Sequence, residues 1–400
     1  MDEAQKKARR QMAARQRIAK NRFRHSLLLT GIALVMLLVI LLGNLIVKDR
    51  PFSDTENRSL AQRPSLSLSA ITDGSFFTRL TDWYSDQFMG RDGWISLHLR
   101  ELRRLGQRES GGVYLGKQGR LLSEPETPDE PALENTLTAI NTFSAAHPEL
   151  HTRMMLVPGA AAVMTEALPK NAPVRDQMAD IHAVRDVLDE SVQWLEVGDV
   201  LLAHAGEEIY YRTDHHWTSY GAYLVYAETC AAMDLTPGDF TVYTVTEEFE
   251  GTLASRSGSH ARKDAIEIYG LSDESLQYDV TYGEDTARIC SVYQRSALET
   301  KDKYTVFFGG NHDRIEIRTT ANTGKSLLLF KDSFANCFVQ FLLPGYDRIT
   351  VIDPRYYYGS LDAILNSGVT DVLFLYSADT FLTDTSLADV LNTAAAPDPE

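Results

Sequence analysis

The chain has 400 residues, of which 44% are apolar and 24% are charged, so it is long enough to bury a large core. The formal net charge is −16, yet residues 1–25 carry nine Lys and Arg against two acidic residues, which makes that head +7 and leaves −23 for the remainder. An acidic main body argues against nucleic acid as a partner, because phosphate binding is driven chiefly by Lys and Arg.

An uncharged run of 21 residues, LLLTGIALVMLLVILLGNLIV, occupies positions 27–47. As a helix it would span about 30 Å, the thickness of the apolar part of a bilayer. The basic stretch before it is long for a signal peptide, and no A-x-A site precedes KDRPFSDTENRS, so we expect an uncleaved anchor over 26–47. The excess of positive charge keeps residues 1–25 as a cytoplasmic tail and exports the rest. A buried core helix is the alternative, but the preceding residues lack the apolar periodicity of a domain.

The segment after the anchor is rich in Pro, Ser and Arg and shows no period, which predicts an extracellular tether over 48–75. Residues 76–400 are expected to form one extracellular domain. The patterns within these segments predict helices at 75–88, 92–105 and 131–146, a hairpin at 113–122 and a buried strand at 153–157.

In the C-terminal hundred residues, apolar runs of strand length alternate with helical segments. The predicted strands are 326–330, 348–352 and 371–376, and the predicted helices are 334–343 and 360–368. This order predicts an α/β domain with parallel strands, right-handed crossovers and helices on both faces. Functional groups in such sheets gather at the carboxyl ends of the strands, which here are KDSFAN (331–336), DPRYYYG (353–359) and SAD (377–379).

Ser333 in KDSFAN is a candidate nucleophile. A serine on the turn between a buried strand and the next helix stands above the sheet, beside the first N–H groups of that helix. The Phe334 amide would then belong to an oxyanion hole. The alternative is that Ser333 or Asp332 only caps the helix that begins at Phe334.

A serine nucleophile needs a base, and the stretch YYRTDHHWTSYGAY at 210–223 offers one. In an extended segment, Asp214 and His216 face the same side and His215 faces the other. His216 would be the general base and Asp214 the group that orients it. The alternative is a polar turn that caps a helix and packs its histidines beside Trp217.

A metal site is disfavoured, because adjacent histidines point apart and no third ligand stands at a fixed short spacing. We therefore expect neither a metal nor a cofactor. The three cysteines, Cys230, Cys290 and Cys337, match no disulfide framework or zinc ribbon, and at most one pair could form outside the cell. Cys230 and Cys337 lie in apolar patterns that are typical of buried thiols.

Together these motifs resemble the DHHW proteins, bacterial membrane-anchored relatives of the alginate O-acetylation proteins within the SGNH-hydrolase superfamily. The resemblance rests on nine segments: ENRSLAQRPSLS (56–67), DWYSDQFMGRDG (82–93), VYLGKQGRLL (113–122), LVPGAAAVMTEALP (156–169), YYRTDHHWTSYGAY (210–223), FEGTLASRSG (249–258), FFGGNHDRI (307–315), LLLFKDSFAN (327–336) and IDPRYYYGSL (352–361).

The resemblance implies an SGNH-hydrolase-like parallel sheet flanked by helices, with the D-x-H pair before the serine in chain order. It also implies that Ser333 is the nucleophile, His216 the base and Asp214 its orienter. Lys331 stands where ordinary SGNH enzymes have the glycine of G-D-S, and their Gly and Asn blocks have no clear match here. Asn311 in GGN (309–311) is a candidate for the oxyanion hole, although GGN is equally typical of a hairpin turn.

Arg355, at the next strand end, is a candidate to bind a substrate carboxylate or sugar hydroxyl, or else to pair with Asp353. The resemblance implies a membrane-anchored extracellular serine acyltransferase or esterase that moves an acetyl group onto or off a cell-surface polysaccharide. A multi-pass membrane acyltransferase is the expected partner. The alternative is a non-catalytic glycan-binding or scaffold protein of a polysaccharide-modification complex.

Overall fold

The structure is a computed structural model that describes residues 3–283 and 287–395. The chain divides into two compact units. The first contains residues up to Asp54 together with Arg58–His98, and the second contains Thr55–Asn57 together with the chain from Leu99. Residues 76–98, which the sequence placed with the main domain, therefore fall in the first unit.

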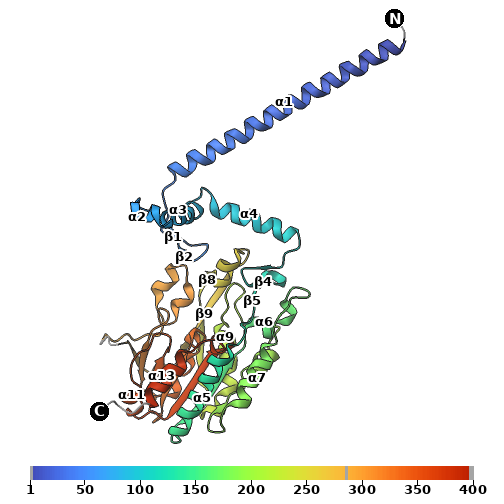
Figure 1. Cartoon of the computed structure of the whole chain (residues 1–400). Helices are drawn as coiled ribbons and strands as arrows, with labels where there is room; N and C mark the ends of the chain where they lie inside the picture. The colour runs from blue at the N-terminus through green and yellow to red at the C-terminus, as the bar shows by residue number, and fades with distance from the viewer. Residues whose placement is uncertain (1–2, 284–286, 396–400) are drawn as a thin grey trace. The chain divides into compact units, whose positions relative to one another are not determined.

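The first unit begins with α1 (Glu3–Ile46), a helix of 44 residues that contains the uncharged run (Figure 1). Within the described part of the chain, α1 alone is long and apolar enough to cross a membrane, and the window that meets this test is not buried against the rest of the protein. By length and composition it is a single-pass anchor or a signal sequence.

Three short helices follow α1. An ion pair between Arg58 and Asp86 holds the chain before them against the end of the second helix, α3. Asp86, at the end of α3, accepts both guanidinium arms of Arg58 at 2.9 and 2.5 Å and the Ala61 N–H at 2.8 Å. The hydrogen bonds from Arg58 are the main cause that lowers the pKa of Asp86 to about 2. The elements of this region are β1 (Phe52–Ser53), β2 (Arg58–Ser59), α2 (Leu68–Thr72), α3 (Ser75–Asp86) and α4 (Arg91–Arg104), which confirms the two predicted helices.

The second unit is built on a seven-stranded sheet in the order β10-β11-β13-β12-β14-β6-β7. Its strands are β6 (His151–Val157), β7 (Gln193–Trp194), β10 (Tyr278–Tyr282), β11 (Arg314–Thr319), β12 (Ser326–Lys331), β13 (Arg348–Ile352) and β14 (Asp371–Ser377). The five strands from β13 to β7 pair in parallel, which confirms the parallel pairing predicted for β12, β13 and β14.

The expected all-parallel sheet is wrong at one edge, where β10 and β11 run antiparallel to their neighbours. The physical reason is the short connection from β11 to β12, residues 320–325. Two parallel strands of one sheet need a crossover of a dozen or more residues between them, whereas so short a link reverses the direction of the chain, although β13 lies between β11 and β12. The result is a mixed α/β fold with a parallel centre.

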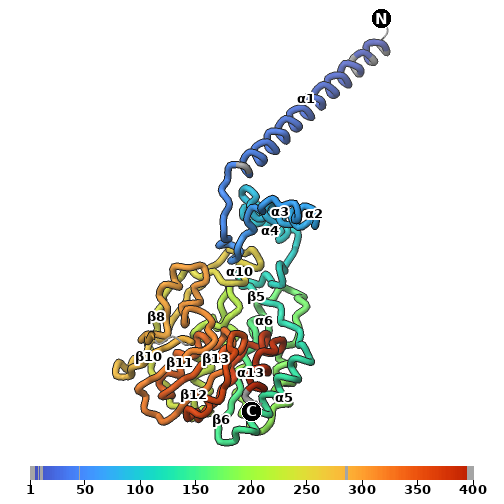
Figure 2. The backbone as a smooth tube through the Cα atoms, turned by 60° about the vertical axis from the view of Figure 1, so that its left-hand side comes forward, coloured from blue at the N-terminus to red at the C-terminus, as the bar shows by residue number. Residues whose placement is uncertain are grey.

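Helices cover both faces of the sheet, and alternate residues of each strand supply the two cores. Leu327 and Leu329 of β12 face a core that includes α9 (Ser219–Thr229), whereas Leu328 and Phe330 face the opposite core. That second core is covered by α5 (Glu130–Ala146), α7 (Gln177–Val187) and α13 (Ser386–Ala395), with α5 and α13 side by side (Figures 1 and 2).

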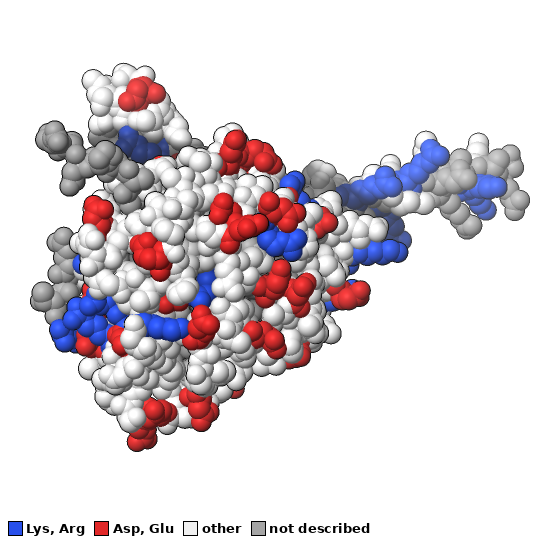
Figure 3. Space-filling view, turned by 90° about the horizontal axis from the view of Figure 1, so that it is seen from below, with Lys and Arg blue, Asp and Glu red and all other residues white. Residues whose placement is uncertain are grey.

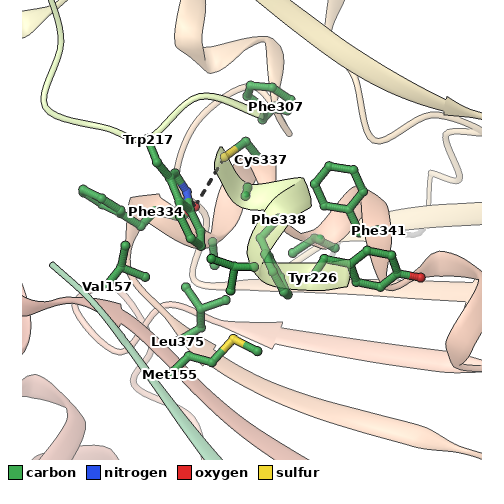
Figure 4. Close-up of a cluster of buried hydrophobic side chains, with 14 of the residues drawn as sticks. Met155, Val157, Trp217, Tyr226, Phe307, Phe334, Cys337, Phe338, Phe341 and Leu375 are labelled. Atoms are coloured by element: carbon green, nitrogen blue, oxygen red, sulfur yellow. Dashed lines mark hydrogen bonds between the residues drawn. The ribbon is translucent and has the colours of Figure 1, made fainter. Parts of the chain in front are cut away.

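The helix predicted at 334–343 is wrong, because the chain instead makes three 3-10 turns, η6 (Ser333–Cys337), η7 (Val339–Phe341) and η8 (Leu343–Gly345). Every residue from 334 to 343 is buried, so the segment has no solvent-facing side. It packs Phe334, Phe338 and Phe341 into a cluster with Trp217 and Tyr226 (Figure 4), and Pro344 cannot donate a helical hydrogen bond.

The remaining predictions of secondary structure are largely confirmed. The hairpin is β4 (Val113–Leu115) with β5 (Leu121–Ser123), and the helix predicted at 360–368 is confined to α11 (Asp362–Leu365). A second antiparallel pair, β8 (Phe240–Phe249) with β9 (Asp264–Leu271), was not predicted.

All three cysteines are free thiols, and Cys230 and Cys337 are buried as expected. The other short elements are β3 (Glu109–Ser110), η1 (Lys117–Gly119), α6 (Ala160–Val163), η2 (Thr165–Ala167), α8 (Gly198–Ala203), η3 (Ala231–Met233), α10 (Thr252–Ser257), η4 (Arg295–Glu299), η5 (Lys303–Val306) and α12 (Ala378–Phe381).

Candidate active site

The carboxyl ends of three adjacent parallel strands carry a group of polar residues that are buried or partly buried. Ser333 follows β12, Asp353 follows β13 and Ser377 ends β14. Because β12 pairs in parallel with both β13 and β14, these three ends lie at the same edge of the sheet. KDSFAN, DPRYYYG and SAD therefore meet where the sequence predicted.

Asp332 fixes the turn that presents Ser333. Its Oδ2 accepts the N–H of Ser377 at 3.0 Å and the Ser377 hydroxyl at 2.6 Å, which holds the turn to the end of β14. Its Oδ1 accepts the Phe334 N–H at 2.9 Å. Asp332 thus takes the capping role that the sequence left open between Asp332 and Ser333, and the Phe334 amide, expected in an oxyanion hole, is already bonded.

The DHHW loop connects a β-bridge to a helix. Tyr210 and Trp217 form the bridge, Thr218 caps α9 by accepting the Gly221 N–H at 3.1 Å, and the residues between them make successive bends. The Trp217 Nε1–H donates to the Phe334 carbonyl at 2.8 Å. This bond joins the DHHW loop directly to the turn that carries Ser333.

His216 lies within hydrogen-bond distance of both Ser333 and Asp214. His216 Nε2 is 2.8 Å from Ser333 Oγ, and His216 Nδ1 is 2.6 Å from Asp214 Oδ1. Asp214 and His216 are buried, with 2% and 5% of their surfaces exposed. Since an ionised carboxylate only accepts hydrogen bonds, the network assigns the proton of a neutral His216 to Nδ1 and leaves Nε2 to accept from the Ser333 hydroxyl.

Four donors converge on the Asp214 carboxylate. Oδ1 accepts the N–H and Nδ1–H of His216, and Oδ2 accepts the Thr252 N–H at 2.8 Å and the Thr252 hydroxyl at 3.0 Å. Burial alone would raise the pKa of Asp214, but the neighbouring histidines and these donors outweigh it and leave the pKa well below its usual range. A side chain at Gly251 would clash, because its Cβ would lie 2.2 Å from Asp214 Cβ.

Thr252 and Gly251 were missed by reasoning from the D-x-H spacing. The only signal for them was the FEGTLASRSG segment, which the family resemblance included without a role. Their contacts show why a glycine precedes a hydroxyl residue there: the first lets the backbone approach Asp214, and the second donates two hydrogen bonds to it.

His215 does not point away from His216, so that expectation is wrong. The bends of the loop bring the two ring centroids to 3.9 Å, and His215 Nδ1 lies 2.8 Å from the Thr252 hydroxyl. Because that hydroxyl donates its proton to Asp214, the His215 Nδ1–H is the donor to Thr252. Desolvation, together with the charge of His216, lowers the pKa of His215 to about 4, so His215 is uncharged at neutral pH.

The same bends remove the geometric argument against a metal. Asp214, His215 and His216 present ligand atoms that all lie within 4.8 Å of one another, so these three residues could hold an ion. Such an ion would compete with the existing bond between His216 Nδ1 and Asp214 Oδ1. That no metal is bound stays a prediction, and elemental analysis of the purified protein tests it.

Tyr304 contacts both partners of the hydrogen bond between His216 and Ser333. Its ring stacks on the His216 ring with centroids 3.9 Å apart and planes inclined by 14°, and its hydroxyl donates to the Ser333 carbonyl at 3.1 Å. Burial raises the pKa of Tyr304 well above 10, so the phenol keeps its proton. Nothing in the surrounding sequence distinguished this tyrosine from an ordinary core residue.

A network of polar side chains around Lys331 joins the turn to the end of β13. Lys331, which is 1% exposed, places Nζ 3.2 Å from Asp353 Oδ2 and 3.1 Å from Asn311 Oδ1. The Asn336 amide also donates to Asn311 Oδ1 at 3.1 Å. Arg355 forms a two-pronged ion pair with Asp353 at 2.8 and 2.7 Å, which is one of its two predicted roles. Burial lowers the pKa of Lys331 despite Asp353.

These observations define a class of structure. It is an α/β fold with a mixed sheet flanked by helices, and hydrogen-bonded Ser, His and Asp side chains lie at the carboxyl ends of its parallel strands. The family model described as "DHHW protein" matches residues 151–352, a little over half of the chain. The chain belongs to this family.

Two solved proteins share the fold. A DHHW family protein from Eubacterium siraeum is 24% identical, with a TM-score of 0.61 over 70% of this chain and 95% of that one. Bacillus cereus PatB1 is 18% identical, with a TM-score of 0.58 over 68% of this chain and 98% of that one. A second PatB1 structure, with a sulfonyl adduct, is 19% identical, with a TM-score of 0.56 over 67% of this chain and 95% of that one. A comparison with curated protein sequences finds no significant match.

Proposed function

We propose that this protein is a serine acyltransferase or esterase in which Ser333 is the nucleophile, His216 the general base and Asp214 its orienter. The observation that carries the proposal is the continuous hydrogen-bonded series from Asp214 through His216 to Ser333, with contacts of 2.6 and 2.8 Å. Each contact has the direction that nucleophilic catalysis needs, because the Nδ1–H points to the carboxylate and Nε2 faces the hydroxyl.

In the first half-reaction, Ser333 Oγ attacks the acyl carbon of an ester donor while its proton moves to His216 Nε2. The C–O bond to the leaving group then breaks, and His216 returns the proton to the departing oxygen, leaving an acyl-serine. In the second half-reaction, His216 takes a proton from a sugar hydroxyl or from water, and that oxygen attacks the acyl carbon. The bond between the acyl carbon and Ser333 Oγ then breaks as His216 returns the proton to Ser333 Oγ. The ionised Asp214 stabilises the imidazolium in both halves.

The tetrahedral intermediates carry a negative oxygen that needs hydrogen-bond donors. We assign one to the Asn311 side chain. Its Oδ1 accepts from Lys331 and Asn336, which fixes the orientation of the amide and leaves the NH₂ group to donate elsewhere. The Phe334 N–H contributes only if its bond to Asp332 opens in the reacting complex.

The proposed setting follows from α1 and from the family resemblance. Because positive charge precedes the apolar run, we propose that residues 1–25 are cytoplasmic, that residues 26–47 lie in the membrane, and that the chain from residue 48 onward is outside the cell. Acetyl is the proposed acyl group, a cell-surface polysaccharide the acceptor, and a multi-pass membrane acyltransferase the donor partner. Under the alternative, a scaffold protein, the same fold would bind glycan without turnover.

Covalent labelling of Ser333 tests the proposal. The full chain, purified in a nonionic detergent, is exposed to phenylmethylsulfonyl fluoride or briefly to nitrophenyl acetate, and the modified peptide is identified by mass spectrometry. We expect the adduct on Ser333, a much slower reaction in His216→Ala, and normal labelling in the control Ser191→Ala, which changes an exposed serine. Label on another residue, or unchanged ester turnover in Ser333→Ala, would reject the nucleophile and favour the scaffold alternative.

A further inference from the structure

The second unit contains a basic pocket of about 550 Å³ beside the β4–β5 hairpin. Five cationic side chains line it: Arg103, Arg108, Lys117, Arg120 and Lys170. Its lining contains no Asp or Glu, and its other walls include the apolar side chains of Leu115, Leu121, Leu168 and Pro169. A concave site with cations and apolar patches is suited to an organic anion rather than to a simple ion.

The cations in this basic pocket are not neutralised by the protein, with one exception. Arg120 donates to Glu208 at 2.6 Å and to the Tyr210 carbonyl at 2.8 Å. Within residues 3–283 and 287–395, Lys117 and Lys170 have no ion-pair partner. The Nε and Nη2 atoms of Arg103 are shielded from solvent but have no hydrogen-bond partner in the same described residues, and burial lowers the pKa of this guanidinium.

An unpaired, shielded guanidinium is costly in the free protein, because its lost hydration is not replaced. Such a group is typical of a site that awaits an anionic ligand. The surrounding charge makes the pocket more unusual, because the chain after residue 25 carries a net −23. Figure 3 shows acidic side chains distributed over one face of the molecule, with basic ones among them.

The basic pocket is connected to the candidate active site through the backbone. The Leu121 N–H donates to the Arg212 carbonyl at 2.8 Å, and Arg120 donates to the Tyr210 carbonyl, so β5 is bonded to the start of the DHHW loop. The pocket residues Ser259 and Ala261 follow shortly after α10, whose first residue, Thr252, donates to Asp214. The pocket is therefore built from segments that are bonded to, or continuous with, those that support the Asp214–His216 pair.

We propose that this pocket binds acidic units of the acceptor polysaccharide, so that the substrate class is an anionic glycan. The guanidinium groups would pair with a carboxylate or phosphodiester, and the apolar walls would pack against the C–H face of a sugar ring. The inference that the bound glycan is the substrate rests on the proposed function. The binding of an anionic glycan to the pocket does not depend on turnover.

The test measures binding to the full chain in nonionic detergent, using Ser333→Ala so that no reaction interferes. The probes are oligogalacturonate, the same oligomer with its carboxylates methyl-esterified, and poly(glycerol phosphate), with affinities measured by calorimetry at low and high salt. We expect binding of at least one anionic probe, no binding of the esterified oligomer, and weakening by salt. Preference between the two anionic probes identifies which acidic group the pocket accepts.

The variants locate the site. Lys117→Gln with Lys170→Gln should weaken binding by about tenfold, since two exposed ionic contacts are lost. Arg185→Gln with Arg288→Gln removes the same charge from surface positions outside the pocket and should leave the affinity unchanged. Arg103→Met should weaken binding without lowering the thermal midpoint, whereas a structural arginine would cost stability.

Equal binding of the charged and esterified oligomers, or equal losses in the two double variants, would overturn the proposal. If Arg103→Met fails to fold, the Lys117 and Lys170 double variant still decides the outcome. The two proposals can fail separately. If the proposed function is wrong and the pocket proposal is right, the anionic probe still binds, but Ser333 acquires no label in the covalent-labelling experiment.

Discussion

Asp214→Asn should abolish most activity while leaving the protein folded. The Asp214 carboxylate accepts four hydrogen bonds, two at each oxygen, and an asparagine offers only one oxygen. If its NH₂ replaces Oδ2, that group meets the Thr252 N–H, which can only donate. If it replaces Oδ1, it meets the His216 N–H and forces the His216 proton onto Nε2, where the ring no longer accepts from Ser333.

The magnitude follows from these two arrangements. Either one leaves a buried backbone N–H without an acceptor, at a cost of about 1–3 kcal/mol in the free energy of unfolding. The second also inverts the His216 tautomer, and the loss of the carboxylate removes the stabilisation of the imidazolium. The corresponding change in a serine protease lowers kcat by about 10⁴-fold, and we expect about 10³ to 10⁴ here.

The assay is kcat/KM for nitrophenyl acetate, measured together with urea unfolding of the same samples. The matched control is Thr252→Val, which keeps the shape and the backbone donor but removes one hydroxyl donor to Asp214. That control loses the hydroxyl bond to Asp214 and the acceptor of the His215 Nδ1–H, but it keeps the carboxylate and both of its bonds to His216, so it should lose no more than about tenfold in rate. If Asp214→Asn retains a rate within tenfold of the wild type while folded, His216 does not depend on the carboxylate and the reasoning is wrong.

Tyr304→Phe should lower kcat/KM by about tenfold, because the ring still stacks on His216 but the bond to the Ser333 carbonyl is lost, whereas Tyr304→Ala should lose far more and should also alter the pH–rate profile. Asp86, whose pKa falls to about 2, contributes stability that is complete above about pH 4 and is lost as the pH falls toward 2. Asp86→Asn should therefore expose the chain around Arg58 to protease at pH 7, with little further change on acidification. Zinc analysis of the purified protein should find no stoichiometric metal, and zinc that disappears in His215→Ala would contradict the serine mechanism. External protease should digest the main domain in protoplasts and spare α1, and a cytoplasmic carboxyl terminus would refute the proposed topology.

The parallel centre of the sheet was predictable because its strands are buried on both faces and read as continuous apolar runs separated by helical segments. The antiparallel edge was not, since the direction of β11 depends on a short link whose two strands are not neighbours in the sheet. The helix predicted for the buried segment at 334–343 was wrong for another reason. Periodicity cannot distinguish an α-helix from a series of 3-10 turns when every side chain faces the core.

The grouping of Asp214 and His216 was predicted on the assumption of an extended segment, and the structure produces it differently. In the bends of the loop, Asp214 Oδ1 accepts both the backbone and the ring of His216, so the same arrangement also draws His215 close. Tyr304 and Thr252 could not be predicted, because their contacts come from chain segments far from the motif. The D-x-H spacing identifies Asp214 and His216 as partners. It does not predict the contacts with Thr252 and Tyr304 that hold their side chains in place.

Trp217, the last residue of the DHHW motif, fixes the register between the DHHW loop and the turn that carries Ser333. His216 contacts the Ser333 side chain at 2.8 Å, and Trp217 donates to the Phe334 carbonyl, also at 2.8 Å, so consecutive residues of one segment meet consecutive residues of the other. The Trp217 ring is fully buried and stacks near Phe338, which prevents the loop from sliding along the turn. Tryptophan thus supplies both a directional bond and a large packed surface. The position of His216 relative to Ser333 is therefore set by the Trp217–Phe334 bond as well as by the 2.8 Å bond between His216 and Ser333.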